Sequence, residues 1–200
     1  MIVTPEHLIE ILDAKYSAMV QNICILDKTC LQKKRCSTSQ RYPLLNFDKI
    51  KDSVYRGKKT PPSVDGLLAH KGVLCFVELK SWENFLHYQH PQTVDDIQFQ
   101  LSSFKLKDKL EYSMSICVTE AENEKLFLTI PVAFIVVTDI DVETNGWGSF
   151  VQNMESLSQT ASDWEVLCNE FTKEYLKNMC DVTTIYVTCK QFDNRISEIR

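Results

Sequence analysis

The 200-residue sequence contains few glycines and no long apolar run. Its five glycines are scattered, so it has no glycine-rich loop of the kind that holds phosphates in nucleotide-binding proteins. No uninterrupted apolar stretch reaches the roughly 18 residues that a membrane-spanning helix requires. The first twenty residues lack the charged, apolar and small-residue order of a secretory signal peptide. We therefore expect a cytoplasmic protein with no membrane partner.

Internal repeats, low-complexity segments and the nucleophile elbow of serine hydrolases are also absent. What remains is an ordinary globular composition, with 44% hydrophobic and 24% charged residues. The length suits one domain with a sizeable core. We expect a single domain over 1–200: an N-terminal helix and a basic irregular segment (1–62), a motif-bearing core (63–140), and a C-terminal helix and strand (141–200).

Cysteine, in contrast, is abundant, with eight residues in the chain. Without a signal peptide this number does not favour disulfide bonds. Five residues separate Cys24 from Cys30, and five separate Cys30 from Cys36, whereas zinc-binding pairs are usually two to four residues apart. The sequence therefore favours thiols and leaves the role of this cluster open.

The net charge of −5 is unevenly distributed. Residues 1–80 have a balance of +5, and residues 81–200 have a balance of −10. Between residues 28 and 59 ten basic residues accompany only two acids, so this segment is either a phosphate-binding surface or a solvated loop. Its candidate nucleic-acid-binding residues are Lys33, Lys34, Arg35, Arg41, Arg56, Lys58 and Lys59. The acidic C-terminal half, including the predicted helix at 163–181, is a candidate surface for a protein partner.

Hydrophobic periodicity predicts an α/β fold. Thr4 and Pro5 are typical of a helix start, and the segment 24–62 has the punctuation of irregular structure. The predicted strands are 64–69, 73–80, 114–119, 126–130, 131–140 and 182–189, and helices are predicted from Pro5, over about 94–110 and from about 163. This order predicts a three-layer sandwich, in which helices flank a central mixed β-sheet.

Polar residues interrupt the apolar pattern in the stretch "VDGLLAHKGVLCFVELK", residues 64–80. Alternation along a strand puts Glu78 and Lys80 on one face and turns Leu79 to the other, and a hairpin would bring Asp65 close to them. Two carboxylates and a backbone carbonyl, here that of Leu79, form the hard oxygen site that Mg²⁺ prefers. A lysine beside such a metal can orient or help deprotonate a water molecule. The pattern therefore indicates phosphodiester hydrolysis, although Glu78 and Lys80 are also compatible with a strand that simply leaves the core.

This stretch resembles the PD-(D/E)xK nuclease superfamily. In that superfamily an acid opens one strand of a hairpin and (D/E)-x-K closes the next, which Asp65 and Glu78-Leu79-Lys80 match. The resemblance implies a restriction-endonuclease-like fold, a glutamine on the following helix (Gln100, or alternatively Gln98), and an additional acid on the first helix (Glu6 or Glu10). It also implies a strand before the Asp65 strand, for which residues 52–56 are a candidate.

The resemblance implies an endonuclease or exonuclease that uses Mg²⁺ or Mn²⁺, held by Asp65, Glu78 and Leu79. Asp65, Glu78, Lys80 and Gln100 would form its catalytic group. A homodimer is a further expectation, because nucleases that cut both strands are often dimers. The alternative is a catalytically inactive nuclease-fold protein that binds nucleic acid or protein. His87 and His90 follow the motif and are expected at the surface.

Overall fold

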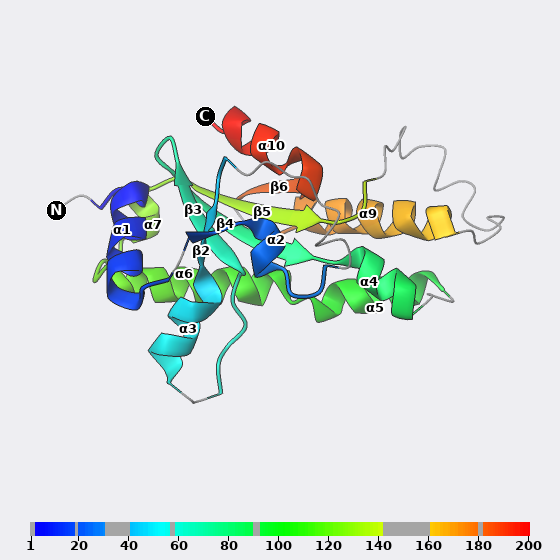
Figure 1. The fold of residues 1–200 in the computed structure, drawn as a ribbon, viewed down its shortest axis with the longest axis horizontal. Helices are drawn as coiled ribbons and strands as arrows, with labels where there is room; N and C mark the ends of the chain where they lie inside the picture. The colour runs from blue at the N-terminus through cyan, green and yellow to red at the C-terminus, as the bar shows by residue number, and fades with distance from the viewer. Residues whose placement is uncertain are drawn as a thin grey trace.

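The computed structural model describes residues 3–18, 20–30, 41–56, 59–89, 93–141, 161–179 and 182–200. Its sheet consists of β1 (Val20–Gln21), β2 (Leu44–Asn46), β3 (Gly66–His70), β4 (Val73–Lys80), β5 (Val132–Thr138) and β6 (Thr183–Thr188). The helices are α1 (Pro5–Tyr16), α2 (Ile23–Leu26), α3 (Phe47–Tyr55), α4 (Trp82–Tyr88), α5 (Val94–Ser103), α6 (Leu106–Glu120), α7 (Leu126–Thr129), α9 (Ala161–Lys177) and α10 (Phe192–Glu198), with a short 3₁₀ helix at Cys189–Gln191. Figure 1 shows their arrangement.

The six strands form one mixed sheet in the order β1-β2-β3-β4-β5-β6. Neighbouring strands from β1 to β4 are antiparallel, whereas β4, β5 and β6 run parallel to one another. Helices α4 to α7 connect β4 to β5, and α9 lies between β5 and β6 in the chain. The α/β class and the mixed sheet were predicted correctly.

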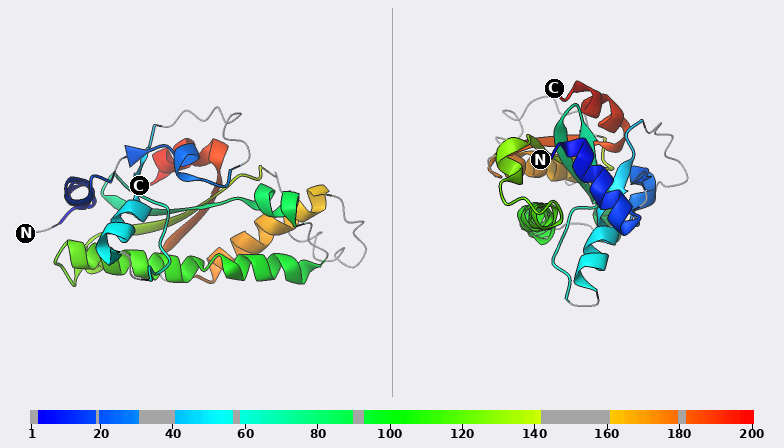
Figure 2. Two further views of the ribbon diagram at one scale, coloured as in Figure 1. Left: turned by 60° about the horizontal axis from the view of Figure 1, so that its bottom comes forward. Right: turned by 90° about the vertical axis from the view of Figure 1, so that its left-hand side faces the viewer.

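Helices cover both faces of the sheet (Figure 2). On the first face, α1, α3, α5, α6 and α9 pack against apolar strand residues such as Phe76 and Phe134. On the second face, α2 and α10 pack against the alternate residues, among them Val77 and Ile135. Because successive side chains of a strand point to opposite faces, the even-numbered residues of β4 lie on the first face. The side chains of Glu78 and Lys80 belong to that face.

The hairpin that carries the motif was predicted correctly. Strands β3 and β4 pair in register from Gly66 opposite Val77 to His70 opposite Val73. Gly72 in the turn has φ of +76°, a conformation that glycine adopts without steric cost. The start of α1 also agrees with the prediction, since the Thr4 side chain accepts a hydrogen bond from the His7 N–H and Pro5 is the first helical residue.

Three sequence predictions were wrong. Residues 114–119 and 126–130 are not strands, because α6 continues to Glu120 and α7 spans Leu126–Thr129. In α6 the buried residues recur every three or four positions, so packing on the sheet decides for a helix (Leu106, Leu110, Ser113, Cys117). The helix predicted over about 94–110 is two helices, because Lys105 adopts a left-handed conformation with φ of +49°.

The segment 24–62 also contains more regular structure than its composition predicts. Strand β2 takes the position next to the Asp65 strand for which residues 52–56 were the candidate. Residues 52–55 instead form the end of α3, whose Phe47 and Ile50 are buried on the core side. No helix among the described residues is long and apolar enough to cross a membrane.

Candidate functional site

Glu78 and Lys80 form an ion pair at the end of β4. The Glu78 side chain is completely buried, and its Oε1 lies 2.5 Å from the Nζ of Lys80, whose side chain is 14% exposed. The Lys80 ammonium also lies 4.8 Å from the centre of the Phe104 ring, a cation–π distance. Glu78 is thus anchored inside the protein, and Lys80 reaches the surface beside it.

Asp65 lies directly before β3 and turns its carboxylate toward this pair. Its backbone N–H donates to the Val77 carbonyl at 3.1 Å, which continues the hairpin ladder by one residue. Its Oδ2 accepts a hydrogen bond of 2.7 Å from the N–H of Leu79, the residue between Glu78 and Lys80. The structure therefore brings the three motif residues together.

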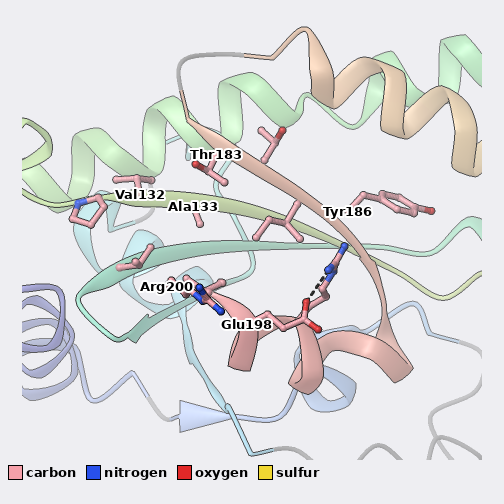
Figure 3. A pocket seen from close by; sticks show the side chains of 12 residues that line it. Val132, Ala133, Thr183, Tyr186, Glu198 and Arg200 are labelled. Carbon is pink, nitrogen blue, oxygen red and sulfur yellow. Dashed lines mark hydrogen bonds and ion pairs between the residues drawn. The ribbon is translucent and has the colours of Figure 1, made fainter.

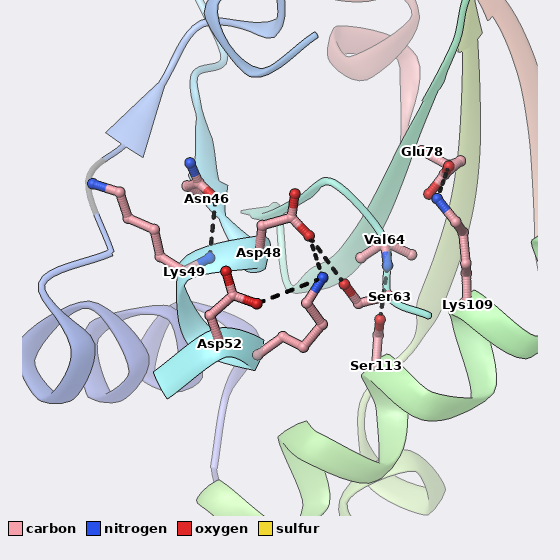
Figure 4. A network of polar contacts seen from close by, with 10 residues as sticks. Asn46, Asp48, Lys49, Asp52, Ser63, Val64, Glu78, Lys109 and Ser113 are labelled. Atoms are coloured by element: carbon pink, nitrogen blue, oxygen red, sulfur yellow. Dashed lines mark hydrogen bonds and ion pairs between the residues drawn. The ribbon is translucent and has the colours of Figure 1, made fainter. Parts of the chain in front are cut away.

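A second lysine, Lys109 of α6, completes the cluster and was not predicted. Its Nζ donates to the Glu78 Oε1 at 2.5 Å, and its side chain is 19% exposed (Figure 4). Burial by itself lowers the pKa of Lys109, but the negative charges of Glu78 and Asp65 raise it, and the pKa ends above its ordinary value. A lysine three residues after Leu106 on the buried side of α6 was the available signal. The sequence predicts one continuous helix over about 94–110, and without the break at Lys105 the pattern does not direct Lys109 toward Glu78.

The Asp65 carboxyl has a strongly perturbed pKa of about 7. Burial is the largest cause, and the nearby charge of Glu78 raises the pKa further. The positive charges of Lys109 and Lys80 and the hydrogen bond from Leu79 act in the opposite direction. Two carboxyl groups that repel each other across a short distance are the electrostatic condition that a divalent cation relieves.

The oxygen atoms at this site suit a hard divalent cation. Glu78 Oε2 is buried and accepts no hydrogen bond from any described residue, and the Asp65 carboxylate lies close enough to be repelled by Glu78. The N–H of Leu79 points to the Asp65 side of β4, and in an extended strand the carbonyl of the same residue points to that side as well. However, no group of three or more His, Cys, Asp and Glu side chains among the described residues is arranged to hold a metal ion. A cation here would depend on the two carboxylates, the backbone carbonyl and water.

Asp65, Leu79 and Lys80 of the motif line a cleft of about 330 Å³, whereas the buried Glu78 is not among its lining residues. Gln100 lines this cleft, as the resemblance implied, whereas Gln98 is exposed and does not line it. Sequence reasoning did not assign Asp48, Asn84 or Phe104 to the site. The cleft is lined by Leu26, Asp27, Lys28, Thr29, Asp48, Asp65, Leu79, Lys80, Ser81, Asn84, Gln100 and Phe104.

Backbone hydrogen bonds hold the Asp65 strand in place. Ser113 of α6 is buried, and its hydroxyl accepts a hydrogen bond of 3.0 Å from the Val64 N–H (Figure 4). On the other side, the N–H of Phe47 at the start of α3 donates to the Asp65 carbonyl at 3.1 Å. Asp65 is therefore fixed between α3 and α6, with its backbone satisfied from both sides.

The proposed additional acids are not at the site. Glu6 accepts a hydrogen bond of 3.0 Å from the N–H of Gly72, which lies in the turn at the opposite end of the β3–β4 hairpin. Glu10 is 77% exposed and pairs with His7 at 3.6 Å on the surface of α1. The structure thus gives Glu6 a structural contact and leaves both acids apart from Asp65, because α1 crosses the sheet near the hairpin turn (Figure 1).

The predicted phosphate-binding residues are only partly described. Lys33, Lys34, Arg35 and Lys58 lie outside the described residues, as do Cys36 and His90. The backbone N–H of Arg41 donates to Asp193 of α10 at 2.9 Å, whereas Arg56 caps the C-terminal end of α3, and Lys59 is exposed. Neither arginine lines the cleft, but Lys28 of the same basic segment does. His87 is exposed, as expected.

Asp139, the residue directly after β5, holds the start of α4 next to the motif strand β4. Its Oδ2 accepts from the Ser81 hydroxyl at 2.5 Å, and its Oδ1 accepts from the N–H groups of Trp82 and Glu83 at 2.8 and 3.2 Å. These hydrogen bonds cap the start of α4, which begins two residues after Lys80. In the sequence, Asp139 opens the segment 139–146, which has the acidic residues of a calcium-binding loop. The glycine of this segment is at the eighth position instead of the sixth, which excludes an EF-hand.

Replacing Asp139 with alanine is expected to lower the free energy of unfolding by about 1–3 kcal/mol, because two N–H groups and a hydroxyl lose their acceptor. Chemical denaturation monitored by circular dichroism measures this change. Asp141→Ala is the matched control, since Asp141 makes an exposed ion pair with Lys190 and should change stability by less than about 1 kcal/mol. Equal effects of the two substitutions would show that Asp139 does not anchor α4.

Other cavities lie apart from the motif cleft or behind it. One of about 480 Å³ lies between β5, β6 and α10, where Arg195 pairs with Glu198 at 2.7 Å (Figure 3). A second, of about 10 Å³, is lined by Cys24, Cys30 and Cys189 on the reverse side of Leu79 and Lys80. Cys24 and Cys30 of the sequence cluster thus line the same cavity as Cys189, which comes from a distant part of the chain.

Comparisons with known proteins leave the site to be interpreted from its geometry alone: no family model, no curated protein and no solved structure matches this chain.

Proposed function

We propose that this chain is a metal-dependent nuclease that hydrolyses phosphodiester bonds at Asp65, Glu78 and Lys80. The observation that carries the proposal is the hydrogen bond of 2.7 Å from the Leu79 N–H to Asp65, because it holds the first acid against the Glu-x-Lys element. The hairpin geometry, with β2 on the outer side of β3, also supports the resemblance to the PD-(D/E)xK superfamily and its restriction-endonuclease-like fold.

The residues present fit the cofactor that this function requires. Mg²⁺ or Mn²⁺ would be held by Asp65, Glu78 and the Leu79 carbonyl, with water completing its shell. When bound, such an ion lowers the pKa of a coordinated water and neutralises charge on a phosphate. The protein supplies the rest: Lys80 lies at the cleft with its ammonium fixed between Glu78 and Phe104, where it can orient the attacking water or the phosphate.

The proposal is tested by incubating the purified chain with labelled DNA and RNA in Mg²⁺, in Mn²⁺ and in EDTA. We expect cleavage that requires the divalent ion and that falls on the order of 10²–10⁴-fold in Lys80→Gln, since the lysine handles a proton or orients water. This variant should fold, because Lys109 still neutralises Glu78.

The matched control is Lys107→Gln. Lys107 lies on α6, two residues from Lys109, in an exposed ion pair with Glu111 at 3.7 Å, so its loss should leave cleavage unchanged. Cleavage by Lys80→Gln at the wild-type rate, or no cleavage by the wild type with any divalent ion, would exclude a catalytic role for this motif.

A second candidate function is a catalytically inactive nuclease-fold protein that binds nucleic acid. The favouring observation is that Lys80 and Lys109 both contact the same oxygen of Glu78, so the charges of this cluster are balanced without a cation. Steeply salt-dependent binding of nucleic acid without cleavage would favour this function. We also propose that the chain forms a homodimer, which sedimentation of the purified chain tests, and that its acidic C-terminal half binds a protein partner.

A further inference from the structure

The motif cleft is small and bordered by several segments. Its volume of about 330 Å³ is at the lower end of the range of roughly 300–1,000 Å³ that is usual for small-molecule sites. Its walls come from residues 26–29, the start of α3, the start of α4 and the α5–α6 corner at Phe104. Such a space accommodates a group of nucleotide size, whereas a continuous duplex is too wide to enter it.

The side chains in this cleft are better suited to a base edge than to phosphates. Asn84 and Gln100 carry amides, which can both donate to and accept from a base, and Asp48 carries a carboxylate, which accepts from amino groups. One Asp48 oxygen is held by Lys51 at 2.7 Å and by the Ser63 hydroxyl at 3.4 Å, so this side chain is preoriented (Figure 4).

The charge of the cleft also disfavours a duplex. Its lining contains two cations, Lys28 and Lys80, and three aspartates. Lys80 is already paired with Glu78, and Asp48 with Lys51, so the cleft has no excess of positive charge. Duplex DNA carries one negative charge per roughly 1.7 Å of its axis, and aspartates near a groove repel such a dense array. A single unpaired nucleotide brings only one phosphate to the motif.

An exposed aromatic side chain lies one helical turn beyond the cleft. Tyr88 follows Asn84 by four residues, so the two occupy the same side of α4, and Tyr88 is 69% exposed. An exposed tyrosine costs solubility without contributing to the core, but it provides a surface on which an unstacked base can lie.

We propose that the cleft receives one unpaired nucleotide, so that the substrate class is single-stranded or locally unpaired nucleic acid and not a continuous duplex. The inference rests on the proposed function for the cleavage step. In this arrangement the phosphate of the unpaired nucleotide lies at Asp65 and Lys80, its base faces Asn84 and Gln100, and the neighbouring base stacks on Tyr88.

The test is fluorescence anisotropy of the 200-residue chain with three labelled 20-nucleotide probes in Ca²⁺: a mixed-sequence single strand, its perfect duplex, and the same duplex with one bulged nucleotide. DNA and RNA versions of each probe show which of the two nucleic acids the chain binds more tightly. We expect the single strand and the bulged duplex to bind at least about tenfold more tightly than the perfect duplex.

Tyr88→Ala should weaken single-strand binding about 5- to 150-fold, the loss expected for one stacked base. Tyr112→Ala is the matched control, because Tyr112 is an exposed tyrosine of α6 that does not line the cleft. Equal or tighter binding of the perfect duplex, equal effects of the two tyrosine substitutions, or no binding of any probe would overturn the inference.

The inference and the proposed function can fail separately. Metal-dependent cleavage of perfect duplexes that is lost in Lys80→Gln would keep the nuclease and overturn the single-strand inference. Single-strand preference that depends on Tyr88, without cleavage in Mg²⁺ or Mn²⁺, would keep the inference and overturn the nuclease.

Discussion

Replacing Asp65 with asparagine is expected to stabilise the protein at alkaline pH and to abolish its cleavage activity. Asparagine keeps the acceptor for the Leu79 N–H and removes the charge that Glu78 repels. It also removes one of the two carboxylates that would hold the metal, and losing several kcal/mol of metal-derived stabilisation lowers the rate on the order of 10³-fold. A substitution that improves the fold while removing activity separates a functional residue from a structural one.

The pH dependence follows from the raised pKa of Asp65. Its carboxyl has an ordinary pKa of 3.8 and a folded-state pKa of about 7, so the folded chain retains a proton that the unfolded chain releases. The stability associated with this proton is complete below pH 3.8 and is lost as the pH rises through about 7. In metal-free buffer the advantage of Asp65→Asn over the wild type should therefore grow from pH 5 to pH 8.5, by roughly 2–4 kcal/mol.

Urea denaturation of both proteins in EDTA at several pH values measures this difference. Asp52→Asn is the control, because Asp52 is a mostly exposed aspartate of α3 at the edge of an ion pair with Lys51. An advantage that does not change with pH would mean that Asp65 has an ordinary pKa and that no charge repulsion exists at the site.

Replacing Glu78 with alanine is expected to be among the most destabilising substitutions in the chain. The change leaves Lys80 and Lys109 without their shared counter-ion, and both lysine side chains are more than four-fifths buried. Removing one partner of a buried ion pair costs about 3–5 kcal/mol, because the remaining charges stay desolvated. Thermal and urea denaturation of the variant measure the loss.

Glu111→Ala provides the comparison for Glu78→Ala. Glu111 pairs with Lys107 on the exposed side of α6, the helix that carries Lys109, and its removal should cost less than about 1 kcal/mol. The triple variant Glu78→Leu, Lys80→Met, Lys109→Met should recover much of the stability, since apolar residues of similar size often replace a buried ion cluster without loss. A cost below about 1 kcal/mol for Glu78→Ala would show that both lysines are free to move into solvent.

The hairpin and the motif could be predicted from the sequence because both depend on short-range patterns. Alternation determines which residues of β4 share a face, and Gly72 marks the turn, so local pattern alone is enough to put Glu78 and Lys80 side by side. The position of Asp65 follows from the same register. Long-range contacts are not required for any of these steps.

The rest of the site depends on contacts that no local pattern encodes. Lys109 lies 31 residues after Glu78 and reaches it only because Lys105 breaks the helix and redirects α6 along the sheet. Asp139 reaches α4 because β5 pairs in parallel with β4. Asp48 reaches the cleft because the N–H of its neighbour Phe47 donates a hydrogen bond to the Asp65 carbonyl. Glu6 was placed wrongly for the same reason, since a helical wheel gives the face of a helix but not where it crosses the sheet.

The way α10 covers the second face of the sheet has a consequence for the order of folding. The first face is covered by helices that all precede the last strand, β6, in the sequence, so its core can form as these segments are synthesised. On the second face, Phe192 and Ile196 of α10 complete the cover, and the hydrogen bond from Arg41 to Asp193 closes a loop of 152 residues. Contacts of such large sequence separation form late. A nascent chain therefore carries the assembled hairpin, with its acids and lysines already together, while the apolar residues on the reverse of β4 and β5 still await their helix.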